Sequence, residues 1–560
     1  MRKVVPIVVV LAVVGGVIAA IALSGGDDKA PSSTTAAADR GATSPEDAVL
    51  LEPAESFFSA KAAGTEGSID WGARCDTSTG RLALPLFPQQ PCFKPFTGDN
   101  GGATATGVTA DTIKVVVYES QPDDPVLKFI YAQVNNTDTP NQAFETAQNF
   151  NTIFSKYYET YGRKVELVRF DATGNISDSV AATADAESIA NDIKPFMVLG
   201  GPLLTNAFAD TLARNKIMCV ACTPGQPQAW YEERAPYVWD IQKNQDQNQL
   251  MVAEYVGKRL KGGKALHAGD PALQSKERVF GYVYVASSDS SKQLYDRFVE
   301  ELRGYGVSLA NVESYALPTD LPNTARDMIT RMKEKGVTSV LFMGDPLAPQ
   351  TLTKIATEQQ FFPEWIITGS ALVDTAAFSR TYDQTQWAHA FGPSNLFARM
   401  PPESGGAAYL HQWYFGKPAP APTSVALIAP TLQFLYSPLQ GVGTDLTPEN
   451  VQKVLFGASI IPSTPVTPQI SYGNRGVWPQ TDYSALDDQT EVWWDPKAVG
   501  IDELNHEGTG LWMYVDGGKR YLPGQWPKGE PKVFDPAGAV SIYDTPPKGA
   551  EISRDYKPVK

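Results

Sequence analysis

The sequence predicts an α/β protein made of two Rossmann-like lobes joined by a multi-strand hinge. Two stretches carry this prediction. Residues 196–223 are typical of a strand, a glycine turn, a short helix and a second strand. Residues 339–370 repeat that order, with Gly344-Asp345-Pro346-Leu347 where the first stretch has Gly200-Gly201-Pro202-Leu203. Because strands joined through a helix are normally parallel, two such units predict two similar lobes that face each other.

The carboxyl ends of these strands are the expected binding region. In open α/β sheets, ligands bind on the side where the parallel strands end. The first turn of a helix also leaves N–H groups without partners, and these favour an anion. The two units therefore predict a site between the lobes, with N–H donors on the first wall and mixed polar groups on the second.

Size and charge limit the possible functions. The chain has 560 residues, more than one ordinary domain, and 42% of them are hydrophobic. The formal net charge is -15 and the isoelectric point is about 4.9. Nucleic acid as a partner is disfavoured, since its phosphates require a basic face.

Residues 1–23 carry a targeting signal. Two basic residues, Arg2 and Lys3, precede an uncharged run from Val4 to Leu23. This run is long enough to span a membrane. It is either an uncleaved anchor in the cytoplasmic membrane or a signal peptide cut at Ala20-Ile21-Ala22, and both alternatives predict an extracytoplasmic, anchored or secreted body.

Two segments without a regular pattern follow the targeting signal. Residues 24–50 contain small and polar residues and are expected to form a flexible linker. Residues 51–105 are an irregular N-terminal extension, rich in Pro and Gly, that contains Cys75 and Cys92. Outside the cytoplasm these two cysteines are expected to form a disulfide that holds a segment with little core.

Cys219 and Cys222 form a C-x-x-C pair at the end of an expected strand. In an extended strand the two residues would lie about 10 Å apart, beyond disulfide reach, whereas a turn at Ala221-Cys222 would bring them together. Structural thiols or a structural disulfide are favoured over a redox site, because no helix start of the thioredoxin kind follows.

Between residues 107 and 238 the periodicity predicts a first α/β lobe. Strands are expected at Thr112–Tyr118 and Val165–Phe170, followed by the 196–223 unit. Helices are expected over residues 141–161 and 178–193, where apolar residues recur at helical spacing.

A second lobe is expected over residues 242–385, because the same plan recurs. Its strands are expected at Val279–Val285 and Val312–Ala316, and the 339–370 unit completes it. Its helices are expected over residues 248–260, around Leu294, Phe298 and Leu302, and from about residue 324.

After about residue 386 the chain is expected to return to the first lobe. Residues 390–475 would complete that lobe with an amphipathic helix at 425–435, which Pro430 would kink or start late. Another crossing is expected near residues 468–480. Residues 477–560 are rich in Trp, Pro and Gly and are expected to form a C-terminal extension that wraps the body.

These features in order resemble the type I periplasmic binding proteins. The resemblance is carried by Gly107-Val108-Thr109 before the first strand, by Phe170-Asp171-Ala172, and by the Gly200-Gly201-Pro202 turn with the strand at 217–223. It covers residues 107–475, and the leucine-binding branch that serves branched-chain amino acid ABC transporters is the most similar. The terminal extensions are like those of actinobacterial members. The resemblance implies a two-lobed clamshell that closes on a small molecule.

The family pattern also implies candidate ligand-binding residues. In amino-acid binders the first lobe holds the carboxylate, and by position Thr205, Ala221 and Thr223 match those groups. The second lobe of the family supplies an aromatic residue and an acid. This chain instead has Asp345 and Ser370 in those loops, which puts an α-amino acid ligand in doubt.

Several candidate residues have alternative structural roles. Tyr118 ends the first strand, and there it either lines the cleft or packs in the core. Thr205 either binds the ligand or caps its helix. Asp345 either replaces the missing acid or ends its strand. The histidines show no metal-ligand spacing, and neither a metal nor a cofactor is expected.

The predicted function is that of a solute-binding protein, not of an enzyme. It would close on a small polar ligand, such as an amino acid, an amide or a related carboxylate, and deliver it to the permease of an ABC importer. The first alternative is a membrane-anchored sensor or cell-envelope interaction protein with the same fold. The second is a thiol–disulfide enzyme that uses Cys219 and Cys222, since no other catalytic motif is present in the sequence.

Overall fold

The computed structural model describes residues 54–286, 289–316, 321–370, 372–400, 405–551 and 555–560. The predicted targeting signal at 1–23 and the linker at 24–50 lie outside the described residues. Within the described part, no helix combines the length and the apolar character that a membrane crossing requires.

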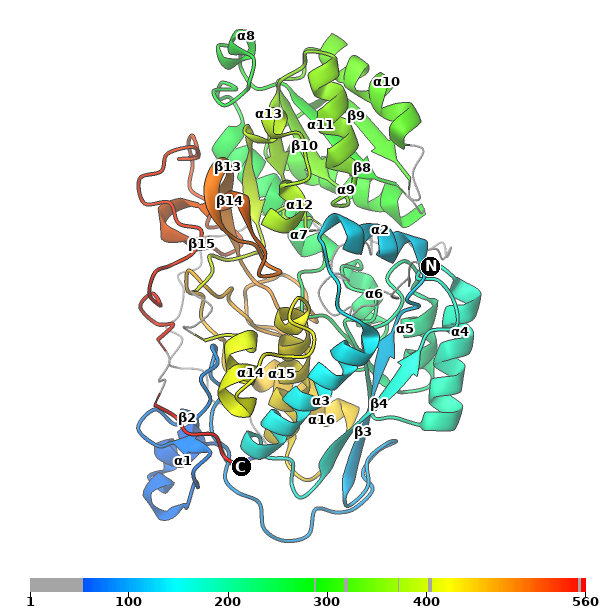
Figure 1. Cartoon of the computed structure of the whole chain (residues 1–560), viewed down its shortest axis with the longest axis vertical. Coiled ribbons are helices and arrows are strands. Elements are labelled where there is room, and N and C mark those ends of the chain that lie inside the picture. Colours follow the sequence, from blue (N-terminus) through cyan, green and yellow to red (C-terminus); the bar gives the residue numbers. More distant parts are fainter. Residues whose placement is uncertain (1–53, 287–288, 317–320, 371, 401–404, 552–554) are drawn as a thin grey trace, which may run out of the picture.

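Two α/β lobes lie one above the other along the long axis of the molecule (Figure 1). The first lobe contains a five-stranded parallel sheet in the order β4-β3-β5-β6-β7. Its strands are β3 (Thr112–Glu119), β4 (Lys164–Asp171), β5 (Met197–Leu199), β6 (Met218–Val220) and β7 (Val238–Trp239). The strands predicted for this lobe are therefore present and parallel.

Helices lie on both sides of this sheet, with α4 and α5 on one side and α3 and the returning helices on the other (Figure 1). They are α2 (Pro125–Gln133), α3 (Pro140–Tyr157), α4 (Ser179–Ser188), α5 (Ala207–Arg214), α6 (Gln228–Glu232), α14 (Ala407–Phe415), α15 (Val425–Val442) and α16 (Pro448–Gly457). Helix α15 is continuous through both Pro430 and Pro438. The chain thus returns to the first lobe after about residue 405. The predicted return after about residue 386 was too early, because residues 390–394 form a strand of the second lobe's sheet.

Local sequence explains where these helices begin. Helix α3 starts with a capping box, in which Thr139 and Gln142 bond each other's backbone N–H groups, and with Pro140 in the first turn. Its buried residues include Ala143, Ala147 and Phe154, which recur at helical spacing and face the core.

The second lobe contains an eight-stranded mixed sheet in the order β14-β13-β12-β11-β10-β8-β9, with β15 paired to β13. Its strands are β8 (Phe280–Val285), β9 (Leu309–Tyr315), β10 (Ser339–Met343), β11 (Glu364–Ile367), β12 (Ala390–Ser394), β13 (Gln489–Ile501), β14 (Glu507–Tyr514) and β15 (Arg520–Tyr521). Strands β8 to β12 are parallel, and β13 to β15 join them antiparallel. The helices are α7 (Gln245–Tyr255), α8 (Pro271–Gln274), α9 (Asp289–Gly304), α10 (Leu321–Glu334), α11 (Ala348–Glu358), α12 (Ala376–Ser379) and α13 (Gln384–Trp387).

Both faces of the second sheet are buried. Successive residues of its strands therefore contribute to two different apolar clusters, one on each face. In β10, Val340 and Phe342 belong to one apolar cluster, whereas Leu341 and Met343 belong to another. Because successive side chains of a strand point to opposite faces, a continuous apolar run is what a doubly covered strand requires. This explains the uninterrupted apolar run in the sequence at this strand.

The C-terminal segment is part of the second lobe's sheet and core. Strand β13 pairs with β12 through Phe391 and Trp493. Trp494 and Trp512 are buried in the same cluster as the parallel strands. The tryptophan-rich residues 489–521 therefore complete this lobe, and the chain then continues down the side of the molecule to the first lobe (Figure 1).

The segments that cross between the lobes are bonded to one another. The backbone N–H of Asp240 donates to the carbonyl of Tyr483 at 3.0 Å. The hydroxyl of Tyr472 donates to the carbonyl of Asp240, also at 3.0 Å. These bonds join the first crossing, which is the segment between β7 and α7, to the crossing near residues 468–488. The connection between the lobes therefore has several strands of chain, as predicted.

Helix α2 brings the two lobes into apolar contact on the other side. Its residues Leu127, Ile130 and Tyr131 are buried in one cluster with Phe342 and Leu352 of the second lobe. The side-chain amide of Gln350 also donates to Gln133 at 3.2 Å. This helix was not predicted from the sequence.

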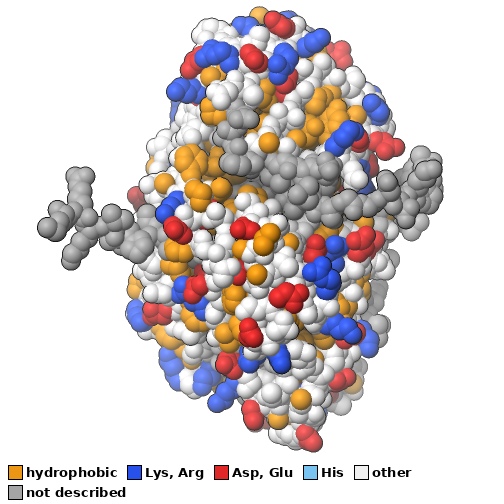
Figure 2. Space-filling view, turned by 90° about the vertical axis from the view of Figure 1, so that its right-hand side faces the viewer, with side chains coloured by type: hydrophobic (Ala, Val, Ile, Leu, Met, Phe, Trp, Pro, Cys, Tyr) orange, Lys and Arg blue, Asp and Glu red, His pale blue; other side chains and the backbone are white. Residues whose placement is uncertain are grey.

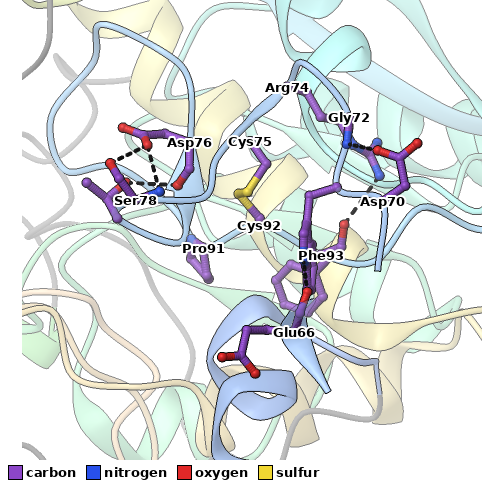
Figure 3. Close-up of a disulfide and its surroundings, with 12 residues drawn as sticks. Glu66, Asp70, Gly72, Arg74, Cys75, Asp76, Ser78, Pro91, Cys92 and Phe93 are labelled. Carbon is purple, nitrogen blue, oxygen red and sulfur yellow. Dashed lines mark hydrogen bonds between the residues drawn. A yellow bond between two sulfur atoms is a disulfide. The ribbon is translucent and has the colours of Figure 1, made fainter. Parts of the chain in front are cut away.

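The N-terminal extension contains a short helix and a small hairpin, and the Cys75–Cys92 disulfide links the first hairpin strand to the segment that follows the second (Figure 3). The elements are α1 (Phe57–Ala63), β1 (Cys75–Asp76) and β2 (Arg81–Leu82). The expected pairing of these cysteines is present. Arg74, next to the bridge, forms an ion pair with Glu159 of the first lobe at 2.6 Å, so the extension is attached to that lobe.

Replacing both Cys75 and Cys92 by serine is expected to lower the melting temperature. The bridge closes a loop over a sequence separation of 17, and such a loop typically contributes about 2–4 kcal/mol, mainly by restricting the unfolded chain. Calorimetry of the double variant checks this, with the single Arg81→Ala variant in the same hairpin as a control. An unchanged melting temperature would mean that the bridge does not contribute to global stability.

The surface carries charges of both signs. Figure 2 shows basic and acidic side chains interspersed over the described part of one face of the molecule, with neither sign forming a large patch there. This distribution is unlike the continuous basic face that nucleic-acid binding requires.

Candidate functional site

A cavity of about 100 Å³ lies where the first crossing meets the second lobe. This volume exceeds the space that one water molecule needs. The cavity is lined by Gly225, Gln242, Lys243, Asn244, Gln245, Asn248, Gln249, Tyr282, Tyr284, Val285, Ser291, Leu294, Tyr295, Met343, Gly344, Gly369, Ser370, Leu372, Asp374, Asn395 and Leu396. We call this cavity the junction pocket. It combines an apolar and aromatic wall with many carboxamides, the composition expected of a small-molecule site.

The fold places the lining through strand ends and one helix start. Strands β8, β10 and β11 are parallel neighbours, and the residues at or just after their carboxyl ends line the pocket. Helix α7 starts beside them with a capping box between Asn244 and Gln247. The pocket therefore lies at the edge of the sheet where ligands are expected in this fold class.

Three tyrosines form one wall of the junction pocket. Tyr282 and Tyr284 lie on the same face of β8, two residues apart, and their rings are nearly parallel at a centroid distance of 5.2 Å. Tyr295 of α9 is parallel to Tyr284 at 5.1 Å. Tyr282 is buried, while Tyr284 and Tyr295 are partly exposed. All three tyrosines line the cavity.

A hydrogen-bonded network of carboxamides forms another part of the lining. The Oδ1 atom of Asn248 accepts from Asn395 at 3.1 Å and from Gln489 at 3.0 Å, and its amide nitrogen donates to the carbonyl of Thr368 at 3.1 Å. These amides are therefore committed to one another. In contrast, the Oε1 atom of Gln249 is buried and has no hydrogen-bond partner among the described residues.

Lys243 is the one cationic side chain among the described lining residues, and its ammonium group bonds to other groups of the protein. Its Nζ atom donates to the carbonyl of Asp488 at 3.0 Å and lies 5.2 Å from the ring centre of Trp478. Burial lowers the pKa of Lys243 to about 8, while the nearby Asp488 and Asp487 carboxylates oppose that decrease. The ammonium group thus helps to hold the crossing segments together.

Asp374 is the one carboxylate among the described residues of the lining. It is buried, and its Oδ2 atom accepts a hydrogen bond from the hydroxyl of Ser394 at 2.6 Å. Burial raises the pKa of Asp374 to about 6, against the lowering effect of that hydrogen bond. No cationic side chain among the described residues contributes to this shift, so Asp374 is a buried acceptor without a charged partner there.

This pKa shift predicts a pH-dependent difference between the wild type and an Asp374→Asn variant. Above the folded-state pKa, the Asp374 carboxylate is charged in both the folded and the unfolded protein. Its burial then lowers the free energy of unfolding of the wild type by about 3 kcal/mol. Below the ordinary value of 3.8 both states are protonated and this cost disappears. The variant should accordingly be the more stable protein at pH 7, and its advantage should shrink as the pH falls from 6 to 4.

Urea unfolding of both proteins at several pH values between 4 and 7 measures this difference. A Ser394→Ala variant serves as the control for loss of the hydrogen bond alone. A constant difference between wild type and Asp374→Asn across this range would show that the carboxyl group titrates normally.

Of the six ligand-binding residues predicted from the sequence, Ser370 lines the junction pocket. Its hydroxyl accepts from the backbone N–H of Gly344 at 3.2 Å and from Thr368 at 3.1 Å. Ser370 therefore joins the loops that follow β10 and β11. The other five residues are outside the pocket lining.

Tyr118 and Asp345 have partners inside the protein. Tyr118 is buried, and its hydroxyl donates to Asp185 at 3.0 Å. Asp345 is also buried, and its Oδ1 atom accepts from the backbone N–H groups of Leu347 and Ala348 at the start of α11. The other carboxylate oxygen accepts from the hydroxyl of Tyr315. Asp345 thus follows the end of β10 and caps the next helix, a role that was not predicted for it.

Thr205, Ala221 and Thr223 lie together in the first lobe. Thr205 accepts from the backbone N–H of Ala207 at 3.3 Å, and Thr223 donates to the carbonyl of Thr205 at 3.3 Å. All three residues are buried. Their ligand-binding roles remain predictions.

Cys219 and Cys222 form a disulfide, with their Cα atoms 5.8 Å apart. This is possible because β6 ends at Val220 and Ala221 takes a left-handed conformation, with φ of 52°, which turns the chain. Both cysteines are buried. A substrate thiol would not reach this bridge in the described conformation, which favours the structural interpretation.

The lining residues that sequence reasoning missed come from segments far apart in the chain. They include Gln249 in α7, the three tyrosines, Asp374 and Asn395. Two of the tyrosines alternate at the end of the predicted strand 279–285, and this pattern was a local signal for an aromatic wall. Asp374 lies four residues after Ser370, close to where the family pattern places an acid.

Among the described residues, no group of three or more His, Cys, Asp or Glu side chains is arranged to hold a metal ion.

No protein-family model and no curated protein sequence matches this chain. Among solved structures, similar chains are solute-binding proteins of ABC transporters. One is the solute-binding protein from Rhodopseudomonas palustris BisB5 in complex with 3,4-dihydroxybenzoic acid, at 13% identity and a TM-score of 0.49, covering 72% of this chain and 97% of that chain.

Two further structures show the same level of similarity. The leucine-, isoleucine-, valine-, threonine- and alanine-binding protein from Brucella ovis is 11% identical, with a TM-score of 0.48, and the match covers 78% of this chain and all of that one. The fatty acid ABC transporter substrate-binding protein from Thermomonospora curvata is 15% identical, with a TM-score of 0.49 and coverage of 77% and 100%. These proteins are of the class that the sequence resembles. With TM-scores below 0.5, the likeness says nothing about what this chain binds.

Proposed function

We propose that this chain is an extracytoplasmic solute-binding protein that takes a small polar solute into the junction pocket and delivers it to an ABC-type importer. The observation that carries this proposal is the pocket itself. It lies at the carboxyl ends of parallel strands, next to the segments that join two lobes, and its lining mixes aromatic faces with carboxamides. Such a position lets a bound solute influence how the lobes sit relative to each other.

The predicted solute classes are amino acids, amides and related carboxylates. A thermal-shift screen with these three classes tests binding, and calorimetry then gives the affinity for any compound that raises the melting temperature. A Ser370→Ala variant removes a pocket hydroxyl, and Ser155→Ala on the exposed part of α3 is the matched control. We expect weaker binding for the first variant only.

The role of the first lobe is tested in the same experiment. Thr223 and the other four residues outside the lining would contribute only in a conformation that opens the first wall toward the pocket. If they do, Thr223→Val should reduce the affinity about ten- to a hundredfold, the usual cost of a hydrogen bond to a charged ligand group. Unchanged affinity with an intact fold would place the site on the crossing and the second lobe alone.

Uptake distinguishes the importer role from a sensor role. Cells that lack the gene should take up the labelled solute more slowly, and the wild-type gene should restore uptake while the Ser370→Ala gene restores less. A solute that binds the purified protein without any change in uptake would favour the alternative of a membrane-anchored sensor or envelope interaction protein.

Anchoring in the cytoplasmic membrane through residues 4–23 is the second part of the proposal. The supporting observation is the uncharged run behind Arg2 and Lys3. Protease added outside intact cells should cut the 24–50 linker and release the body. Protection of the linker from protease would contradict this topology.

A further inference from the structure

The aromatic wall of the junction pocket is shaped for a flat ring. Tyr282, Tyr284 and Tyr295 are parallel to within 14°, with centroid distances from 5.1 to 6.2 Å. Tyr284 and Tyr295 are only partly buried, and both line the cavity. Aromatic rings prefer offset-stacked or edge-to-face partners at such distances. A planar ring that enters the cavity can add to this stack.

Two acceptors of the lining can take further hydrogen-bond donors. Gln249 is 2% exposed, and its Oε1 atom has no partner among the described residues. An unpaired buried acceptor is costly, so a ligand that brings a donor is favoured there. The carboxylate of Asp374 accepts a side-chain hydrogen bond from Ser394 and backbone hydrogen bonds from its own N–H and that of Asn395. A carboxylate can accept about four hydrogen bonds, so one further donor can be accommodated. Both groups therefore select for a ligand with N–H or O–H groups.

A ligand carboxylate has no matching partner in the described lining. Lys243 is the cationic residue there, and its ammonium group is bonded to Asp488 and Met251 and lies over Trp478. Asp374 would in addition repel an anion. The lining thus favours the amide class over amino acids and carboxylates among the proposed solutes.

We infer that the junction pocket binds a planar nitrogen heterocycle of the nucleobase or cyclic-amide type, stacked on Tyr284 and Tyr295 and donating N–H groups to Gln249 and Asp374. This inference rests on the proposed solute-binding function and names the solute class. A nitrogen heterocycle meets both requirements, because its ring has two π faces and its edge carries N–H donors next to acceptors.

Binding is tested with six probes on the full exported chain, namely adenine, cytosine, nicotinamide, leucine, 4-hydroxybenzoate and glucose. We expect at least one of the first three to raise the melting temperature and the last three to have no effect. Binding of leucine, 4-hydroxybenzoate or glucose without any heterocycle would overturn the heterocycle class but leave the solute-binding function standing. If none of the six probes binds, the heterocycle inference is rejected, and the broader solute screen alone then decides the function.

Three variants locate the bound ring. Tyr295→Ala removes part of the stack and should weaken binding of the heterocycle at least tenfold, whereas Tyr295→Phe keeps the ring and should bind normally. Gln249→Met keeps the shape of the side chain without the acceptor, and it should weaken binding roughly 3- to 10-fold. A heterocycle that binds equally well to wild type, Tyr295→Ala and Gln249→Met would lie elsewhere, and the inference would then be wrong.

Discussion

Replacing Arg278 by methionine is expected to destabilise the second lobe by about 3–5 kcal/mol, because it leaves a buried carboxylate without its partner. The Nε atom of Arg278 donates to Glu364 at 2.8 Å, and both side chains are fully buried. The guanidinium also bonds Glu530 of the C-terminal segment. The hydroxyl of Ser339 donates to Glu364 at 2.6 Å, but it cannot replace a positive charge.

A matched ion pair in the same lobe provides the control. Arg326 on α10 contacts Glu358 at 2.7 Å, with side-chain exposures of 59% and 41%. Exposed pairs of this kind contribute only about 0–1 kcal/mol, so Arg326→Met should change stability little. Urea unfolding of the two variants measures the contrast. The double variant Arg278→Met with Glu364→Met should recover part of the loss, since apolar groups can replace a buried pair.

Equal costs for Arg278→Met and Arg326→Met would contradict this prediction. Such a result would mean that water or another group compensates Glu364 once the guanidinium is gone.

Removing residues 489–560 is expected to abolish cooperative folding of the second lobe. The deletion takes away β13 and β14, and with them Val492, Trp494, Leu511, Trp512 and Tyr514 of the core. At roughly 1.5–3 kcal/mol for each large buried side chain, the loss is on the order of 10 kcal/mol. A typical domain has a total stability of only about 5–15 kcal/mol.

The five C-terminal residues offer a control for this deletion. Their contacts are with the first lobe and the N-terminal extension: Tyr556 donates to Asp76 at 2.7 Å, and the N–H of Val559 donates to Tyr157 at 2.9 Å. Deleting residues 556–560 should lower the melting temperature modestly and leave a cooperative transition. Calorimetry and size-exclusion chromatography check both truncations, and a cooperative transition of the second lobe in the longer truncation would refute the prediction.

The regular elements of both lobes could be predicted because their signals are local. The apolar run at β10 and the helical spacing of α3 depend on residues a few positions apart, and burial on the sheet or on one helix face preserves those patterns. The Cys75–Cys92 bridge was equally accessible, since it closes a short loop in a segment with little core. Helix α2 was not predicted, because its apolar residues are buried against the second lobe, and local sequence does not indicate that contact.

The roles of single side chains were decided by tertiary structure. Ala221 turns the chain and lets Cys219 reach Cys222, which no propensity of an apolar run indicates. Asp345 lies at a strand end that suits a ligand, yet the start of α11 and the hydroxyl of Tyr315 use its oxygens. The same neighbours in sequence permit both roles, and only the position of the next helix selects one.

The sequence by itself therefore determined the fold class, the two repeated units and the sheet edge at which a site is expected. The tertiary structure alone decided which residues line that site. Gln249, Tyr295 and Asp374 come from three separate elements, and they converge because the crossing segment starts α7 beside the ends of β8 and β11. Periodicity reports which face of one element is buried, but a pocket depends on distances between elements, and these are set by how the sheets and helices pack.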